Sequence, residues 1–314
     1  MLNTYSPAHA LFMTEPTPAP VAVRYPSPPP ALRWLRWQLG VLQAVAPGLA
    51  EALAWRVFTT PRRLPALGWE AAALAGSAAG WVPYGGGRVA TYSWGEAGAP
   101  AVVLVHGWEH RASFWGGWVA PLRAAGFRVV ALDGPAHGRS TGRRTTLLDF
   151  GQAAQAVVNH AAQTGPVHAV VAHSFGAASV VGLPLSAPAG QSQPPPILPR
   201  LVLLSAPLGP EVVAARFAEL LRLGPPVLAR MKARMQRIIG RDVAELAVPV
   251  AGPRLPVGQT LLLHDEHDGI VPVREAHFIA AAWPAARLLL TSGLGHNRIL
   301  REPAVVRQVV DFLL

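Results

Sequence analysis

The sequence predicts an α/β protein built on a doubly wound, mostly parallel sheet, with a helical cap insertion and an N-terminal helical extension. Short, near-continuous apolar runs alternate with helical segments over most of the chain, which is typical of parallel strands covered on both faces. The 314 residues are 51% hydrophobic and only 14% charged, so the chain can supply the large core that such a sheet requires.

The elements of the sheet follow one another in a regular order. A β-hairpin over Gly80–Glu96 is expected first, turning at Tyr84–Arg88. The apolar runs that predict strands lie at 101–105, 128–132, 167–172, 200–205, 259–264 and 286–291. Segments with helical apolar spacing follow or separate these runs, at 113–125, 147–163, 176–184, 273–283 and 302–313.

Two stretches interrupt this alternation. Pro184–Pro199 is rich in proline and predicts an exposed loop, and Leu208–Pro256 is too long for a single connection and amphipathic, which predicts an inserted helical cap. The expected organisation begins with a proline-rich disordered tail at 1–30 and an N-terminal helical extension at 31–78. The α/β core is formed by two segments, 79–207 and 257–314, and the cap lies between them at 208–256.

The segment 31–58 has apolar residues at three- and four-residue steps, which predicts a helix that Pro47 kinks or divides. Trp34 and Trp37 stand among arginines, so a helix that contacts a membrane surface or a partner is one interpretation. The interpretation we favour from the sequence is a helix packed on the flank of the domain.

Composition excludes several classes of function. The net charge of +10 comes almost wholly from scattered arginines, with no basic stripe interleaved with aromatic residues, so we expect no nucleic-acid partner. The chain has no cysteine, which excludes disulfides and thiol chemistry. We find no convincing export signal and no charge-free stretch long enough to span a bilayer, so a cytoplasmic protein is expected.

Ser174 lies where a buried strand turns abruptly into a helix, in the run Val170-Val171-Ala172-His173-Ser174-Phe175-Gly176-Ala177-Ala178. A nucleophilic serine on such a bend needs small residues two positions before and after it, because strand and helix pass closely there. Ala172 and Gly176 meet this requirement, and the run is close to the G-x-S-x-G nucleophile elbow.

Other polar residues follow the carboxyl ends of neighbouring strands, where reactive groups gather in an open parallel sheet. A serine hydroxyl needs an imidazole to accept its proton, and the imidazole needs a carboxylate to orient it. Asp268 and His296 follow two later strands, and the order Ser174, Asp268, His296 suits this relay. Asp265 is an alternative orienting acid. A metal cluster at His264–Asp268 is disfavoured, because adjacent ligands on one short loop diverge.

With these residues in place, the chain from about Gly80 to Leu314 resembles the α/β-hydrolase superfamily. The resemblance implies that the backbone amides of Trp108, in His106-Gly107-Trp108, and of Phe175 form the oxyanion hole. The segment Asp133–Ser140 is similar to the family's D-x-P-G-H-G-x-S loop, with Ala136 where glycine is usual. That loop is structural in the family, which implies that His137 is not catalytic.

The expected function is hydrolysis of carboxylic esters through an acyl-enzyme intermediate, with a small or medium apolar acyl substrate and neither cofactor nor metal. The same triad also serves peptidases, thioesterases and lactonases, which the sequence does not separate. Epoxide hydrolases and haloalkane dehalogenases of this fold require a carboxylate at the elbow, and Ser174 argues against both. A non-catalytic binding protein of the same fold is the alternative from a different class. The oligomeric state stays open.

Overall fold

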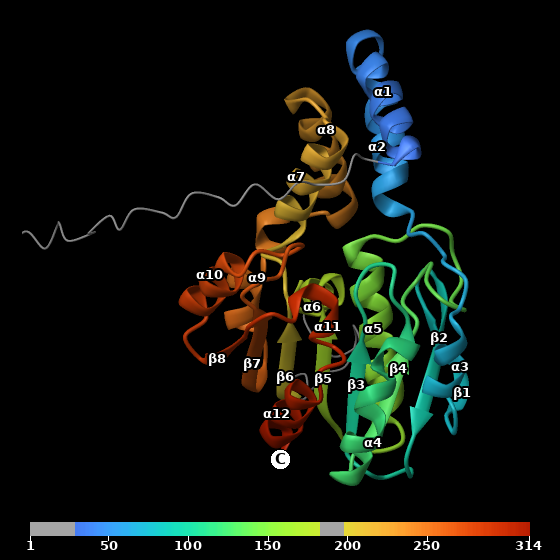
Figure 1. Cartoon of the computed structure of the whole chain (residues 1–314), viewed down its shortest axis with the longest axis vertical. Coiled ribbons are helices and arrows are strands. Elements are labelled where there is room, and N and C mark those ends of the chain that lie inside the picture. Colours follow the sequence, from blue (N-terminus) through green and yellow to red (C-terminus); the bar gives the residue numbers. More distant parts are fainter. Residues whose placement is uncertain (1–28, 183–197) are drawn as a thin grey trace, which may run out of the picture.

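The computed structural model describes residues 29–182 and 198–314 (Figure 1). The proline-rich tail expected over 1–30 lies outside the described residues except for its last two positions. All but the last two residues of the loop expected at 184–199 also lie outside them.

The core is one eight-stranded sheet with the strand order β1-β2-β4-β3-β5-β6-β7-β8. The first two strands form an antiparallel hairpin, and β2 also pairs antiparallel with β4, whereas every other pair is parallel. The predicted doubly wound, mostly parallel sheet is therefore confirmed. The strand bounds are β1 Ala78–Tyr84, β2 Gly87–Trp94, β3 Ala101–Val105, β4 Arg128–Leu132, β5 Val167–His173, β6 Leu198–Leu204, β7 Val257–Asp265 and β8 Ala286–Thr291.

The central strands are apolar throughout because both faces of the sheet are covered. Along β3, Val103 and Val105 pack into one buried cluster, while Val102 and Leu104 pack into another on the opposite face. The first cluster is completed by α5 Leu147–Ala162, α6 Phe175–Val181, α9 Val248–Ala251 and α10 Arg274–Ala282. The second is completed by η1 Ala112–Trp115, α4 Gly116–Ala124 and α12 Pro303–Leu313.

Between β6 and β7 the chain forms only helices, as the pattern of that stretch predicts. Two of them make a hairpin, α7 Pro210–Leu221 and α8 Pro225–Ile239, which extends beyond the sheet in Figure 1. Three short turns follow, η2 Val243–Leu246, α9 and η3 Gly252–Arg254, and they return the chain to β7. Proline at the start of α7 and α8 suits a helix N-terminus, where the missing N–H is not needed.

The N-terminal segment forms a second helical hairpin, α1 Pro30–Val45 and α2 Pro47–Thr59, divided at Pro47 as predicted. A short helix, α3 Gly68–Ala73, lies between this hairpin and β1. The expectation that the segment packs on the flank of the domain is wrong, because α1 and α2 share a buried cluster with α7 and α8. Leu39, Trp55 and Met231 are among its members. Amphipathic spacing specified which residues are buried but not the surface that covers them.

Polar contacts also join the two hairpins, which stand side by side in Figure 1. Arg36 donates to the carbonyl of Leu220 at 2.8 Å, and Gln43 accepts a hydrogen bond from the amide of Gly224. Arg234 and Glu51 form an ion pair at 3.2 Å. Among the described residues, every helix is too short or too polar to cross a lipid bilayer.

Candidate active site

Ser174 occupies the sharp turn between β5 and α6, with φ 54° and ψ −120°. This conformation is costly for a residue with a side chain, and it persists only where the surroundings impose it. Gly176 is one such constraint, because a Cβ there would collide with the carbonyl oxygens of Val105 and His106. Ala172, on the strand side of the bend, is also small and is fully buried. The geometry of a nucleophile elbow is thus present despite alanine in the first glycine position.

His296, at the start of the short helix α11 Gly295–Arg298, connects Ser174 with a carboxylate. Its Nε2 lies 2.9 Å from the Ser174 Oγ, and its Nδ1 lies 2.7 Å from Oδ2 of Asp268. Since an ionised carboxylate only accepts, Nδ1 carries the proton and Nε2 is left to accept the serine proton. The three side chains therefore form one hydrogen-bonded series, although they follow three different strands.

The Asp268 carboxylate is held by more than the imidazole. Its Oδ1 accepts from the amides of Ile270 and Val271 at 2.9 and 2.8 Å. Burial acts to raise the pKa of Asp268, but the hydrogen bonds from His296 and from these amides outweigh burial and lower the pKa below its usual value. The group is consequently a fixed negative charge at neutral pH, as an orienting carboxylate must be.

The rival acid, Asp265, does not contact His296. Its oxygens accept from the Thr291 hydroxyl and from the amides of His267, Leu294 and Gly295, at 2.8 to 2.9 Å. It therefore fixes the loop that leads into His296. No group of three or more potential ligands able to hold a metal ion occurs within residues 29–182 and 198–314.

The two residues assigned to the oxyanion hole lie beside the serine. Their aromatic rings, on Trp108 and Phe175, are in edge contact with centroids 5.1 Å apart. Phe175 is the first residue of α6, so its amide has no intrahelical acceptor, and neither amide donates to an acceptor within the described part of the chain. Gly107 lets the loop that carries Trp108 lie close to the serine, since a Cβ at Gly107 would lie 3.1 Å from the Ser174 Cβ.

Two further histidines stand behind the relay and were not assigned a role in it from the sequence. His173 is fully buried, and its Nε2 donates to the backbone carbonyl of His296 at 3.0 Å. Its ring stacks on His110 with centroids 5.5 Å apart. Burial lowers the pKa of His173 well below the usual value and that of His110 to about 4, so both rings are neutral at pH 7. The only sequence signal was their position next to the elbow and the oxyanion loop.

His137 is committed to the backbone, in agreement with the structural role that the resemblance implied. Its Nδ1 donates to the carbonyl of Pro135 at 2.8 Å, and its Nε2 accepts from the amide of Glu109 at 3.0 Å. Burial lowers its pKa to about 4. The neighbouring Ala136 has φ 64°, the left-handed conformation for which glycine is usual at that position.

An extended segment after α2 lies across the loops of the site and was also missed. The guanidinium of Arg62 binds the Glu109 carboxylate through contacts of 2.7 to 3.1 Å. Glu109 directly follows Trp108 and has φ 59°. Arg63 donates to the carbonyls of Ala136, Ser140 and Gly142 at 3.0, 2.6 and 2.9 Å. The sequence signal was the pair of adjacent arginines, Arg62 and Arg63.

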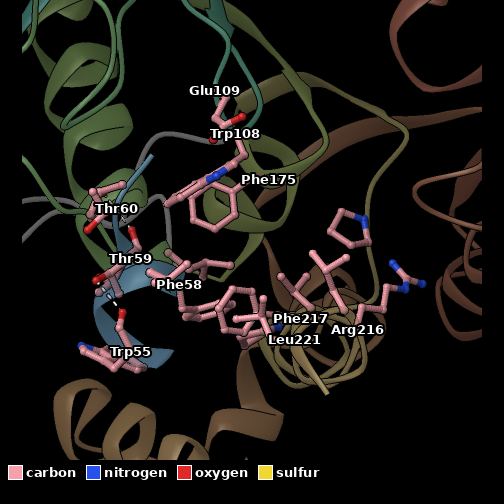
Figure 2. Close-up of a pocket in the computed structure, with 18 of the residues that line it drawn as sticks. Trp55, Phe58, Thr59, Thr60, Trp108, Glu109, Phe175, Arg216, Phe217 and Leu221 are labelled. Carbon is pink, nitrogen blue, oxygen red and sulfur yellow. Dashed lines mark hydrogen bonds between the residues drawn. The ribbon is translucent and has the colours of Figure 1, made fainter. Parts of the chain in front are cut away.

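A cavity of about 930 Å³ opens above Ser174. Trp108, Glu109 and Phe175 line it at the sheet, and Trp55 and Phe58 of α2 line its far side (Figure 2). The insertion completes the wall with mostly apolar side chains, which include Val213, Phe217, Leu221, Met235 and Ile238. The N-terminal hairpin therefore forms part of the wall of the site, which sequence reasoning did not anticipate.

A mostly parallel sheet that carries a serine elbow and a histidine with a buried carboxylate at its carboxyl edge defines the α/β hydrolases. The chain belongs to the α/β hydrolase family, whose sequence model matches residues 102–309.

Solved structures show the same fold at low identity. An esterase of Pyrococcus furiosus, Pf2001, is similar at a TM-score of 0.59 and 17% identity, over 81% of this chain and 98% of that one. The esterase RhEst1 from a Rhodococcus species is similar at 0.54 and 17%, over 75% and 98%. The thioesterase domain of the curacin biosynthetic pathway is similar at 0.50 and 18%, over 76% and 98%.

Among curated proteins, the "Probable oxidoreductase EphD" of Mycobacterium tuberculosis and of Mycobacterium bovis is 37% identical to this chain over 99 residues. The match covers 30% of this chain and only 16% of the length of those relatives.

Proposed function

We propose that this hydrolase is a serine esterase that cleaves carboxylic esters through an acyl-enzyme intermediate. The observation that carries the proposal is the unbroken series Ser174–His296–Asp268, with contacts of 2.9 and 2.7 Å, at the base of an apolar cavity. Catalytic roles for these three residues, and for the amides of Trp108 and Phe175, follow from this arrangement.

In the acylation step, Ser174 Oγ attacks the ester carbonyl as His296 Nε2 takes its proton. The carbonyl oxygen becomes an oxyanion, to which the Trp108 and Phe175 amides donate. His296 then gives the proton to the departing alkoxide, so an alcohol leaves and an acyl-serine remains. Asp268 holds the imidazole in the required tautomer and stabilises its charged form.

In the deacylation step, water replaces the alcohol. His296 Nε2 accepts a proton from the water as its oxygen attacks the acyl carbonyl, and the same oxyanion site is used again. Collapse of the tetrahedral species returns the proton to Ser174 Oγ and releases the carboxylic acid. No redox partner or cofactor is required for this balance.

The cavity favours an uncharged, apolar substrate. The charged side chains at its wall are neutralised locally, because Arg62 binds Glu109 and Arg216 binds Glu275. Its volume of about 930 Å³ is large enough for the small or medium apolar acyl substrate expected from the sequence. In this proposal residues 208–256 act as a cap over the α/β core, and the N-terminal hairpin shares that role.

The test is covalent labelling of the purified protein by a fluorophosphonate probe, together with turnover of p-nitrophenyl esters of increasing acyl length. Ser174→Ala should abolish both signals. Ser292 provides a matched control, because its hydroxyl lies 3.3 Å from His267 Nδ1 as a second serine–histidine contact, so Ser292→Ala should label and turn over normally.

Other outcomes are equally informative. Labelling and turnover that persist in Ser174→Ala would refute the assignment of the nucleophile. An unlabelled wild-type protein would favour a non-catalytic binding protein of this fold. Faster turnover of thioesters, lactones or peptides than of oxyesters would keep the triad and change the substrate class.

A further inference from the structure

Helix α1 is apolar on two opposite faces, which is unusual for a helix at the surface. Its inner face packs through Leu35 and Leu39 into the cluster shared with α2, α7 and α8. On its opposite side a second apolar stripe continues past the turn into α2. This outer face consists of Trp34, Trp37, Val41, Val45 and Leu49, whose exposed fractions are 57%, 58%, 45%, 74% and 62%.

A helix at a protein surface normally buries one apolar face and presents polar side chains on the opposite one. The inner face of α1 is covered, and the outer face has no apolar partner within residues 29–182 and 198–314. Trp34 and Trp37 stack on each other at 4.7 Å between centroids and remain more than half exposed. An exposed tryptophan pair of this kind, on an apolar stripe, indicates a surface that an apolar phase covers.

The charged residues of α1 itself have one sign. Helix α1 carries Arg33 and Arg36 and no acidic residue. Helix α8, which packs on α2, carries Arg230, Lys232, Arg234 and Arg237, again without an acidic residue. Of the acids in the two hairpins, Glu51 and Glu211 are paired with Arg234 and Lys232, and Glu219 of α7 is exposed. Tryptophan and aliphatic residues flanked by arginine are the composition of helices that lie in the interface of anionic membranes.

A second copy of the chain suits this face less well. The five exposed side chains offer on the order of 500 Å² of surface, whereas a stable protein interface buries about 800 Å² on each partner. The face is also a narrow, convex stripe rather than a broad patch. A lipid interface has no such minimum area, because the helix needs only to sink by a fraction of its diameter.

We propose that the outer face of α1, with the tip of the α1–α2 hairpin, docks on the surface of anionic lipid membranes. Trp34 and Trp37 enter the headgroup boundary, and the arginines of α1 meet the lipid phosphates. The same helix lines the cavity with Leu32 and Leu35, so a docked enzyme holds its apolar cavity next to the lipid phase.

The experiment is flotation of the full chain with phosphatidylcholine vesicles that contain or lack phosphatidylglycerol. The wild-type protein should float with the anionic vesicles. The bound fraction should fall as NaCl is raised from about 0.01 M to about 1 M, since salt screens the phosphate contacts. Trp34→Gln/Trp37→Gln should weaken the partition by at least about tenfold, because two interfacial rings are lost.

Two further variants test the proposal, one on the outer face and one elsewhere on the surface. Val45→Glu places an acid at a site that is 74% exposed, so folding should be intact while binding falls several-fold. Phe278→Gln is the matched control, since Phe278 is 62% exposed on α10, which belongs to neither hairpin, and its loss should leave flotation unchanged. Ser174→Ala should float like the wild type, so this result is independent of the catalytic proposal.

Three outcomes would overturn the proposal. The first is a wild-type protein that stays with the dense fraction in the presence of anionic vesicles at low salt. The second is a tryptophan double variant and a Val45→Glu variant that float as well as the wild type. The third is a wild-type dimer in solution that Trp34→Gln/Trp37→Gln converts to monomer without any vesicle binding.

Discussion

At the residue scale, the contact between Asp268 and His296 determines which nitrogen of the imidazole carries the proton. Asp268→Asn preserves the size of the side chain and can offer an N–H to Nδ1, which would place the imidazole proton on Nε2. We expect kcat to fall by about 10⁴-fold with little change in KM, because the substrate does not contact this carboxyl. Steady-state kinetics on a p-nitrophenyl ester measure both constants. Glu266→Gln, an exposed carboxylate on the same loop, is the control and should retain full activity.

His173 offers a second residue-scale prediction. Because its Nε2 donates to the carbonyl of His296, His173→Ala should let the histidine loop shift and lower kcat by about 10- to 100-fold. His173→Gln can restore a donor at the same place and should recover part of the loss. If both variants lose only thermal stability and keep the wild-type kcat, the contact is structural and does not position the imidazole.

At the element scale, the segment after α2 contacts the loop that carries Trp108, through Arg62 and Glu109. Arg62 is largely exposed, so its ion pair with Glu109 contributes at most about 1 kcal/mol to stability. Arg62→Ala should therefore change the melting temperature little while kcat falls several-fold, because Glu109 adjoins Trp108 and holds a left-handed conformation. Arg144→Ala removes an exposed arginine with no assigned contact and is the control. Equal kcat for both variants would contradict the prediction.

The elements that the sequence predicted well are those whose environment is local. Strand β3, Ala101–Val105, is apolar at each position, because both of its faces are covered, and its predicted bounds of 101–105 agree with the structure. The bend at Ser174 was equally predictable, since Ala172 and Gly176 are required only by near neighbours along the chain.

The features that the sequence did not reveal depend on contacts between distant segments. The amphipathic pattern of residues 31–58 indicates a buried face, but nothing in it specifies α7 and α8 as the cover. Arg62 meets Glu109 across 47 positions, and His173 meets His296 across 123, so neither partner could be inferred from spacing. The relay was accessible only because the carboxyl ends of parallel strands converge on one edge.

At the scale of the whole molecule, the buried histidines couple folding to pH. Burial lowers the pKa of His110 and His137 to about 4 and that of His106 and His173 well below the usual value of 6.5. At a pH between the pKa of such a histidine in the unfolded chain and its lower pKa in the folded protein, the unfolded chain binds a proton that the folded protein does not. The free energy of unfolding therefore falls as pH falls. Stability is complete above about pH 6.5 and declines through the range down to about pH 4.

The size of this effect predicts an acid-labile protein. His110 and His137 each remove about 3 kcal/mol between pH 6.5 and pH 4, which together approaches the whole stability of a typical domain. Burial raises the pKa of Asp133, which opposes the loss. Urea titrations from pH 8 to pH 4 should show a midpoint that falls below about pH 6. In His110→Phe, which keeps the aromatic stack on Phe114 without a titrating ring, the fall should be shallower. A pH-independent midpoint would show that these rings gain protons without unfolding the chain.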